Sequence, residues 1–255
     1  MRAVTPTIIK AIIELQTLPT VSKFNLGGGT NLALQFNHRV SDDIDFFCNE
    51  IIGKEGFNNI EKEVKNCFGN KAKSFDDPCD INDQYCFLRF FLDLEDGTTI
   101  KIELLQNMKN LFDVEVKQGI SLLSNKDIGL FKLISTSNRS TKKDIYDLDF
   151  ITDKISLIDL YEDLKVKTLK FNKEEHKTIF DLGKNNTPID NPELLLKFDD
   201  YYDYSKFPSH SKDTIQIIEG SKTWIEAKIS WRSKVRRLYN YLGKDFPGPR
   251  GMKIK

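Results

Sequence analysis

The hydrophobic and polar positions in the first half of the chain change repeatedly between helical and strand spacing. Apolar residues at 8, 9, 12, 13 and 15 follow Thr5-Pro6, which predicts an amphipathic helix with Pro in its first turn. Two strand-like runs, 84–95 and 98–105, meet at Asp96-Gly97 and favour a β-hairpin. Shorter elements are expected between them: strands at 23–26 and 43–47, and helices at 30–36 and 54–67.

The second half of the chain has helical spacing throughout. Helices are predicted at 127–137, about 142–152, 156–169, 174–183 and 222–243. The pattern therefore indicates an α/β (α+β) fold, in which an N-terminal core with a mixed sheet is followed by an all-helical C-terminal part. We place the first domain at 1–154 and the helical domain at 155–255.

Composition narrows the class of protein. The 255 residues include 38 basic and 38 acidic side chains, so net charge indicates no particular partner. No apolar run approaches the roughly 20 residues of a membrane span, and Lys10 and Glu14 interrupt the first apolar stretch. The cysteines at 48, 67, 79 and 86 form no C-x-x-C pair, which argues against structural zinc or a disulfide scaffold. We expect a reduced, cytoplasmic protein without a membrane partner.

Charge is concentrated at the C-terminal end. From Ser221 onward the chain has ten basic residues against only Glu226 and Asp245, and the aromatic residues Trp224, Trp231, Tyr239 and Tyr241 are interleaved with them. A basic, aromatic helix at 222–243 suits RNA, whose phosphates and bases it could contact. The alternative is that the aromatic rings pack on the domain while the lysines form a solvated face.

Two carboxylates on the predicted strand 43–47 suggest a metal site. Because side chains alternate along a strand, Asp43 and Asp45 project from one face while Ile44 and Phe46 are buried on the other. Two such acids about 6–7 Å apart repel each other unless a cation lies between them. Mg²⁺ suits the pair, because it takes oxygen ligands and retains substrate phosphates. By itself, a D-x-D pair is more often two surface acids.

The glycines before this strand favour a metal site over two surface acids. Gly27-Gly28-Gly29-Thr30 lies where a strand is predicted to pass into a helix, and such a turn lets backbone N–H groups approach a phosphate. A tight turn that requires positive φ is the competing interpretation. Other phosphate motifs are absent, because no Lys stands at P-loop spacing and G-x-G-x-x-G breaks at Leu32. A phosphate cradle beside a metal site is what phosphoryl transfer requires.

A third carboxylate is expected on a neighbouring strand. Glu103 fits, because Lys101 and Glu103 share one face of their strand while Ile102 and Leu104 take the other. Asp93 and Glu95, on the other strand of the hairpin, are competing candidates.

The stretch LGGGTNLALQFNHRVSDDIDFF at 26–47 resembles the first motif of the AbiEii/AbiGii toxin family of nucleotidyltransferases, which have a polymerase-β-like fold. The family reads approximately GGT-x-L-x-L-x-x-x-HR-x-S-x-DIDFF. Two later blocks are also similar, DIGLFK at 127–132 to a D-x-x-x-x-K helix, and Arg139 with KDIYDL at 143–148 to an R-x-x-x-KD-x-x-D segment. The chain departs from the family where Glu103 stands at a position that is often Asp.

The resemblance implies roles for particular residues. Asp43, Asp45 and Glu103 would hold Mg²⁺ or Mn²⁺, and Lys132 would steady phosphate charge. The NTP would be held by a larger set: Gly28, Gly29, Thr30, Ser41, Arg39, Asp127 and Asp147. Simpler alternatives remain for the helical residues. Asp127 could cap its helix, and Arg139, Asp144 and Asp147 could form ion pairs between helices. For His38, packing or loop ordering is preferred over general-base catalysis.

The predicted function is metal-dependent transfer of a nucleoside monophosphate from an NTP to an acceptor hydroxyl, with pyrophosphate leaving. The resemblance implies a toxin of a bacterial toxin–antitoxin or abortive-infection system, neutralised by a cognate antitoxin protein. The acceptor would be tRNA or another RNA, or a protein hydroxyl. Two other functions stay open: transfer to a small molecule such as an antibiotic, and non-catalytic binding of nucleotide or RNA on the same fold.

Overall fold

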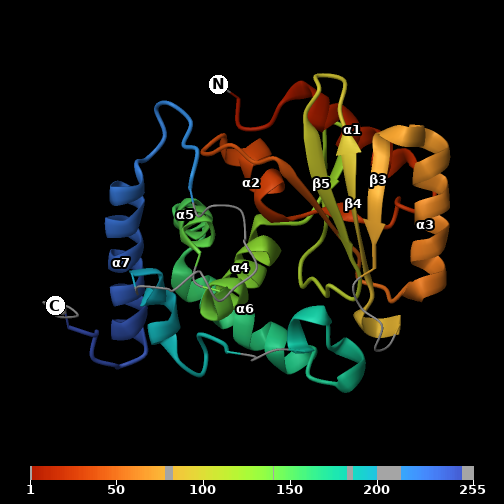
Figure 1. Ribbon diagram of the computed structural model, residues 1–255. Coiled ribbons are helices and arrows are strands. Elements are labelled where there is room, and N and C mark those ends of the chain that lie inside the picture. The colour runs from red at the N-terminus through yellow and green to blue at the C-terminus, as the bar shows by residue number, and fades with distance from the viewer. Residues whose placement is uncertain (1, 78–82, 140, 183–185, 200–213, 249–255) are drawn as a thin grey trace, which may run out of the picture. The chain divides into compact units, whose positions relative to one another are not determined.

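The computed structural model describes residues 2–77, 83–139, 141–182, 186–199 and 214–248 (Figure 1). The chain forms two compact units, each built from several segments. The first unit comprises Met1–Ile128, Lys167–Asn185 and Gln216–Ser221, and the second comprises Gly129–Val166, Asn186–Ile215 and Lys222–Lys255. The second unit thus begins before residue 155, and the chain returns to the first unit at Lys167. The division into a first domain at 1–154 and a helical domain at 155–255 stays a prediction.

A seven-stranded mixed sheet forms the framework of the first unit, in the order β3-β4-β5-β2-β1-β7-β6. Its strands are β1 (Asn25–Leu26), β2 (Asp43–Phe47), β3 (Ala72–Asp76), β4 (Phe87–Asp93), β5 (Thr99–Leu105), β6 (Glu115–Lys117) and β7 (Ile120–Leu122). The β2–β5 and β1–β7 pairs are parallel, and the other pairs are antiparallel. The prediction of an α/β fold with a mixed sheet is therefore confirmed.

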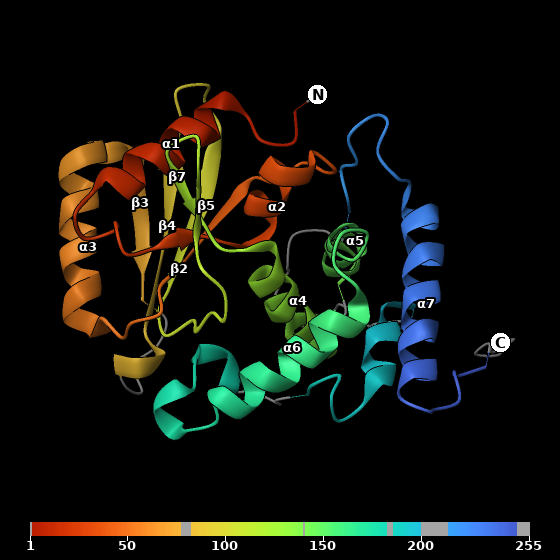
Figure 2. The same ribbon diagram turned by 180° about the vertical axis from the view of Figure 1, so that it is seen from behind.

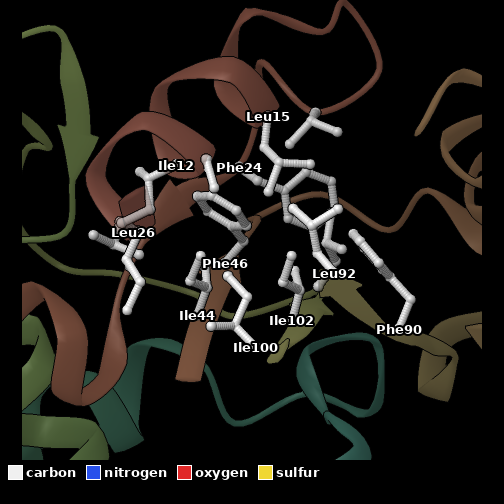
Figure 3. Packing of buried hydrophobic residues seen from close by; sticks show 14 of the residues in the cluster. Ile12, Leu15, Phe24, Leu26, Ile44, Phe46, Phe90, Leu92, Ile100 and Ile102 are labelled. Carbon is white, nitrogen blue, oxygen red and sulfur yellow. The ribbon is translucent and has the colours of Figure 1, made fainter. Parts of the chain in front are cut away.

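Helices α1 (Pro6–Thr17) and α3 (Gly53–Phe68) pack against one face of this sheet, and α2 (Gly28–Phe36) connects β1 to β2 (Figure 2). Thr5 caps α1, since its Oγ1 accepts a hydrogen bond from the amide of Ile8 at 3.3 Å. The core side chains come from alternate strand positions, among them Ile44, Phe46 and Ile102, and pack beneath α1 (Figure 3). Burial of these apolar side chains fixes which residues face the opposite side of the sheet.

The second unit is helical in its described residues. It contains α5 (Lys142–Ile151), α7 (Trp224–Tyr241), the 3₁₀ segment Pro192–Asp199, and most of α4 (Asn125–Arg139) and α6 (Leu157–Lys170). Trp231 is fully buried and donates from Nε1 to the carbonyl of Leu195 at 2.9 Å. Within the described part of the chain, no helix is both long enough and apolar enough to cross a membrane.

Two lysines of the predicted basic helix form internal ion pairs. Lys234 Nζ lies 2.7 Å from Asp149 Oδ1 and 2.6 Å from Asp153 Oδ1, and Lys222 Nζ lies 2.6 Å from Asp149 Oδ2. The contact between Lys234 and Asp149 joins α7 to α5. Trp231 and Tyr239 are buried, as the packing interpretation expected, but Lys222 and Lys234 do not belong to a solvated face. Arg250, Lys253, Lys255 and Cys79 lie outside the described residues.

One predicted helix, 174–183, is wrong. The segment forms two separate 3₁₀ turns, Glu174–His176 and Ile179–Leu182. The backbone carbonyl of Lys177 accepts hydrogen bonds from Gln84 Nε2 and Asn107 Nδ2, each at 2.7 Å. Because side chains use this carbonyl, and Lys177 itself is extended, the helical hydrogen-bond ladder cannot continue through it.

Candidate active site

The polar face of the sheet brings the two predicted acids of β2 beside two charged residues of β5. In the parallel pairing, Asp43 lies opposite Lys101 and Asp45 lies opposite Glu103. Their neighbours Ile44 and Ile102 are fully buried on the core face, so strand alternation places all four charged side chains on the other face. The side chain of Asp43 is 43% exposed and that of Glu103 only 15%. The predicted third acid is therefore adjacent to Asp45.

The glycine turn contacts this site through Asp45. The amide of Gly27 donates to the carbonyl of Asp45 at 2.8 Å, and α2 begins at the next residue. Gly28 has φ +58°, and a Cβ atom there would overlap Asp45 Oδ2 and come within 2.9 Å of Asp45 Cγ. Only glycine allows both this conformation and this approach. The carboxylate of Asp45 thus lies directly against the N-terminus of α2, whose first turn contains no acidic residue.

Gly29 makes a similar close approach to Arg39 and Ser41. A Cβ atom on Gly29 would overlap Arg39 Nη2 and lie 3.1 Å from Ser41 Oγ. Arg39 is buried and donates from Nη1 to the carbonyl of Val40 at 3.0 Å. Thr30 is fully buried, and its hydroxyl donates to Ser41 Oγ at 3.0 Å and also contacts the carbonyl of Asp43. Thr30 and Ser41 therefore join α2 to the start of β2, while their predicted role in binding the triphosphate stays a prediction.

Two cations hold Glu103. Arg89, which lies opposite Glu103 on β4, approaches Oε1 from Nε at 2.8 Å and from Nη2 at 2.7 Å. Lys101 Nζ lies 2.7 Å from Oε2. Burial alone would raise the pKa of Glu103, but Lys101 and Arg89 outweigh it and keep that pKa below its usual value. Glu103 is thus held as a carboxylate. Arg89 was not among the predicted site residues, although alternation along β4 places it on this face.

The competing acids of the hairpin have partners away from β2. Asp93 pairs with Lys73 at 2.5 Å and accepts a hydrogen bond from Thr99 Oγ1 at 2.5 Å. Glu95 pairs with Lys10 of α1 at 2.6 Å. These contacts favour Glu103 as the acid that accompanies Asp43 and Asp45.

His38, next to Arg39, is buried and packs edge-on against Phe36, with ring centroids 5.8 Å apart. Its backbone carbonyl accepts a hydrogen bond from the amide of Ile218 at 3.1 Å. These contacts favour the packing role that the sequence analysis preferred for His38.

Asp127 occupies the first turn of α4 and binds backbone. Its carboxylate accepts hydrogen bonds from the amides of Leu111 at 2.7 Å and Phe112 at 3.2 Å, and from Ser124 Oγ at 2.8 Å. In return, Ser124 Oγ accepts a hydrogen bond from the amide of Asp127 at 3.0 Å. Ser124 thus caps the start of α4 through its hydroxyl, and Asp127 holds that hydroxyl in place. This arrangement favours a role for Asp127 at the helix cap over contact with the nucleotide.

Lys132 and Asp147 belong to the second unit, where they contact each other. Lys132 Nζ lies 2.7 Å from Asp147 Oδ2 and 2.9 Å from Asp144 Oδ1, and all three side chains are buried. Arg139 Nε lies 2.8 Å from Asp144 Oδ2, so the ion pairs that the sequence analysis considered are present. The proposed contact of Lys132 with phosphate stays a prediction.

Lys167 should reduce the stability of the fold at neutral pH. Burial lowers its pKa to about 8, although the charge of Asp127 opposes the shift. The unfolded chain therefore binds this proton more tightly than the folded protein does. The loss of folding stability caused by the buried ammonium is full below pH 8 and disappears as pH rises toward 10.5, the ordinary lysine pKa. We expect Lys167→Met to raise the free energy of unfolding by about 2 kcal/mol at pH 7.

Urea unfolding at pH 7 and pH 10 measures this effect. The gain from Lys167→Met should shrink at pH 10, whereas the matched variant Lys170→Met, at an exposed position of the same helix, should change stability little at either pH. An equal gain at both pH values would show that the buried charge is not its cause.

Comparison with known proteins identifies the family to which the chain belongs. Residues 15–213 match the family described as "Nucleotidyl transferase AbiEii toxin, Type IV TA system". An uncharacterised protein of Aquifex aeolicus (strain VF5) is 27% identical over 150 residues, which cover 57% of this chain and 65% of that protein. The chain thus spans just under two thirds of the length of this relative.

Two solved structures have a similar fold. A candidate nucleotidyltransferase from H. pylori has a TM-score of 0.51 at 17% identity, covering 92% of this chain and 93% of the other. MenT4, a nucleotidyltransferase toxin of Mycobacterium tuberculosis H37Rv, has a TM-score of 0.54 at 15% identity, covering 94% and 83%. The family resemblance stated from residues 26–47 is confirmed: the chain belongs to the AbiEii family of nucleotidyltransferase toxins of type IV toxin–antitoxin systems.

Proposed function

We propose that the chain transfers a nucleoside monophosphate from an NTP to a hydroxyl group of an RNA. One observation carries the proposal: the carboxylate of Asp45 lies against the N-terminus of α2, with Asp43 on the same face of β2 and Glu103 opposite Asp45 on β5. An acidic cluster beside a helix N-terminus combines oxygen ligands for a cation with backbone donors for phosphate.

The donor set of this site fits magnesium or manganese. Asp43, Asp45 and Glu103 offer only carboxylate oxygens, the ligands that these hard cations prefer. Asp43 is half-exposed and accessible to an entering ion. When bound, the metal would supply charge neutralisation at the phosphates and at the attacking hydroxyl.

The remaining groups act on the nucleotide by position and charge. The amides of Gly28 and Gly29 lie at the start of α2, where backbone N–H groups have no partners within the helix and favour a phosphate. The guanidinium of Arg39, which packs against Gly29, adds positive charge on the same side. We infer that these three residues hold the triphosphate while the acceptor hydroxyl attacks the α-phosphorus and pyrophosphate leaves.

RNA as the acceptor is supported by the charge of α7. Arg236 and Arg237 are exposed on this helix, in the segment where ten basic residues stand against two acidic ones. Exposed arginines bind RNA phosphates with little dependence on sequence. Protein hydroxyls are the competing acceptor, and the experiment below separates the two.

Incubation of the protein with each α-labelled NTP, Mg²⁺ and either total RNA or a protein extract tests the proposal. We expect label to appear in RNA, to require Mg²⁺, and to be removed by ribonuclease but not by protease. The matched control is Asp45→Asn, which keeps the size of the side chain but removes a metal ligand, and should reduce transfer by at least about a hundredfold.

Two outcomes would contradict this function. Label that is removed by protease would assign the acceptor to protein instead of RNA. Transfer that is equal in wild type and Asp45→Asn, or absent with all four nucleotides, would reject the proposed chemistry itself. Expression of the wild type, but not of Asp45→Asn, should arrest growth, as expected for a toxin of this family.

A further inference from the structure

A lysine of the chain lies among the three acids of the candidate metal site. Lys101 Nζ is 2.7 Å from Glu103 Oε2 and 3.9 Å from Asp43 Oδ2. The charge of Lys101 also interacts favourably with Asp45. Lys101 therefore places a positive charge beside all three carboxylates.

Both oxygens of Glu103 are already occupied. Arg89 takes Oε1 through two nitrogens, and Lys101 takes Oε2. In keeping with this, the described residues contain no group of three or more His, Cys, Asp or Glu side chains arranged to hold a metal ion. Asp43, Asp45 and Glu103 are adjacent in the sheet, but Glu103 is turned toward the protein's own cations.

The two cations differ in how readily each can leave. Arg89 holds one carboxylate oxygen with two donors of its rigid guanidinium, an arrangement that fixes the orientation of Glu103. Lys101 makes a single contact with Glu103 through a compact ammonium on a flexible stem, and its side chain is 30% exposed. Movement about its side-chain torsions can therefore withdraw the ammonium without moving β5.

We propose that Lys101 is a built-in counter-ion of the acidic cluster, which a divalent cation must displace from Glu103 Oε2 in order to gain its third carboxylate. The inference rests on the proposed function, since it assumes that the site takes a metal. Lys101 neutralises the repulsion among Asp43, Asp45 and Glu103 in the metal-free protein. The same contact competes with the cation, so the resting site is stable but binds metal more weakly than the three acids alone would.

Titration with Mn²⁺, followed by electron paramagnetic resonance of the free ion, tests this competition directly. Lys101→Met should bind Mn²⁺ about tenfold more tightly than the wild type, because a positive charge 2.7 Å from Glu103 and 3.9 Å from Asp43 is removed. Lys101→Arg, which keeps the charge, should not tighten binding. The matched control is Lys73→Met, on the same sheet but paired with Asp93, and should leave the affinity unchanged.

Amine labelling gives a second measurement that does not depend on substitution. Brief acetylation of the wild type followed by mass spectrometry should modify Lys101 several-fold faster with saturating Mg²⁺ than without it, while the rate at Lys73 should not change. Equal labelling of Lys101 in both conditions, or Mn²⁺ binding to Lys101→Met that is equal to or weaker than that of the wild type, would overturn the inference.

Asp45→Asn separates this inference from the proposed function. If Mn²⁺ binds the wild type and Asp45→Asn equally, or binds neither, the proposed metal site fails. If Asp45→Asn loses binding while Lys101→Met binds like the wild type, the metal site stands and only the role of Lys101 is rejected.

Discussion

Replacing Gly28 by alanine should reduce nucleotide transfer by about a hundredfold or more, the loss expected when reacting groups are displaced by about 1 Å. Gly28 has φ +58°, and its Cα faces the carboxylate of Asp45, so an added methyl group would overlap Oδ2. Relief requires either that the start of α2 moves away or that Asp45 turns out of position. Either movement separates the metal ligand from the backbone donors that we propose for phosphate.

Gly119→Ala is the matched control for backbone strain. Gly119 also has positive φ, at +79°, but no atom lies within 4 Å of the position that its Cβ would take. This variant should lose about 1 kcal/mol of stability from strain while keeping full transfer activity. Both variants should be assayed well below their unfolding temperatures, with circular dichroism to verify the fold. Near-normal transfer by Gly28→Ala would show that contact between this turn and Asp45 is dispensable.

Local sequence pattern was sufficient to predict the centre of the candidate site. Strand β2 (Asp43–Phe47) begins and ends where the alternation of polar and apolar residues predicted. Glu103 was chosen from alternation alone, and the pairing of β2 with β5 places it opposite Asp45. The bounds of β2 and the face on which each acid lies follow from neighbours within a few residues along the chain, which is why the sequence contains them.

Pairing between distant segments was not predictable in the same way. Arg89 approaches Glu103 because β4 and β5 pair in one particular register, and a shift by one residue would have turned Arg89 into the core. Alternation along the strand also predicted that Lys101 and Glu103 share a face, but not that Lys101 reaches Asp43 on the neighbouring strand. Charge pairing across strands depends on distances that a single sequence does not contain.

Short elements were the other source of error. Strands β6 and β7 have three residues each, and all three residues of β6 are exposed, so no hydrophobic alternation identified it. Strand β3 has one buried residue, Ala72. These strands exist because they extend a sheet that is already formed, an effect of tertiary pairing instead of local preference.

Replacing Asp144 by alanine should lower the free energy of unfolding of the second unit by about 3 kcal/mol or more. Asp144 is 1% exposed, and its carboxylate accepts hydrogen bonds from Lys132, Arg139, Ser135 and Thr141 at 2.8 to 3.1 Å. Removal of the Asp144 carboxylate leaves these donors without their acceptor. Of the two carboxylates that contact Lys132, Asp144 and Asp147, only Asp147 then remains. Because both tryptophans, Trp224 and Trp231, lie in this unit, their fluorescence during urea unfolding reports the loss.

The stability that Asp144 provides should depend on pH in a defined direction. Burial would raise the pKa of Asp144, but Arg139 and Lys132 outweigh it and hold that pKa far below its usual range. A carboxylate with a lowered pKa in the folded protein stabilises it fully above the unfolded value of 3.8, and the contribution declines as pH falls below that value. The difference between wild type and Asp144→Asn should therefore be constant from pH 7 to about pH 5 and decrease toward pH 3.

Two variants separate the buried cluster from general charge effects. Asp159→Asn removes an exposed carboxylate from the first turn of α6 and should change stability by no more than about 0.5 kcal/mol. Arg139→Gln removes the half-exposed partner of Asp144 and should have an intermediate effect, because Lys132 remains to neutralise the carboxylate. If Asp144→Ala destabilises no more than Asp159→Asn, the ion pairs of Asp144 do not stabilise the second unit, and the cluster would be available for a functional role of Lys132.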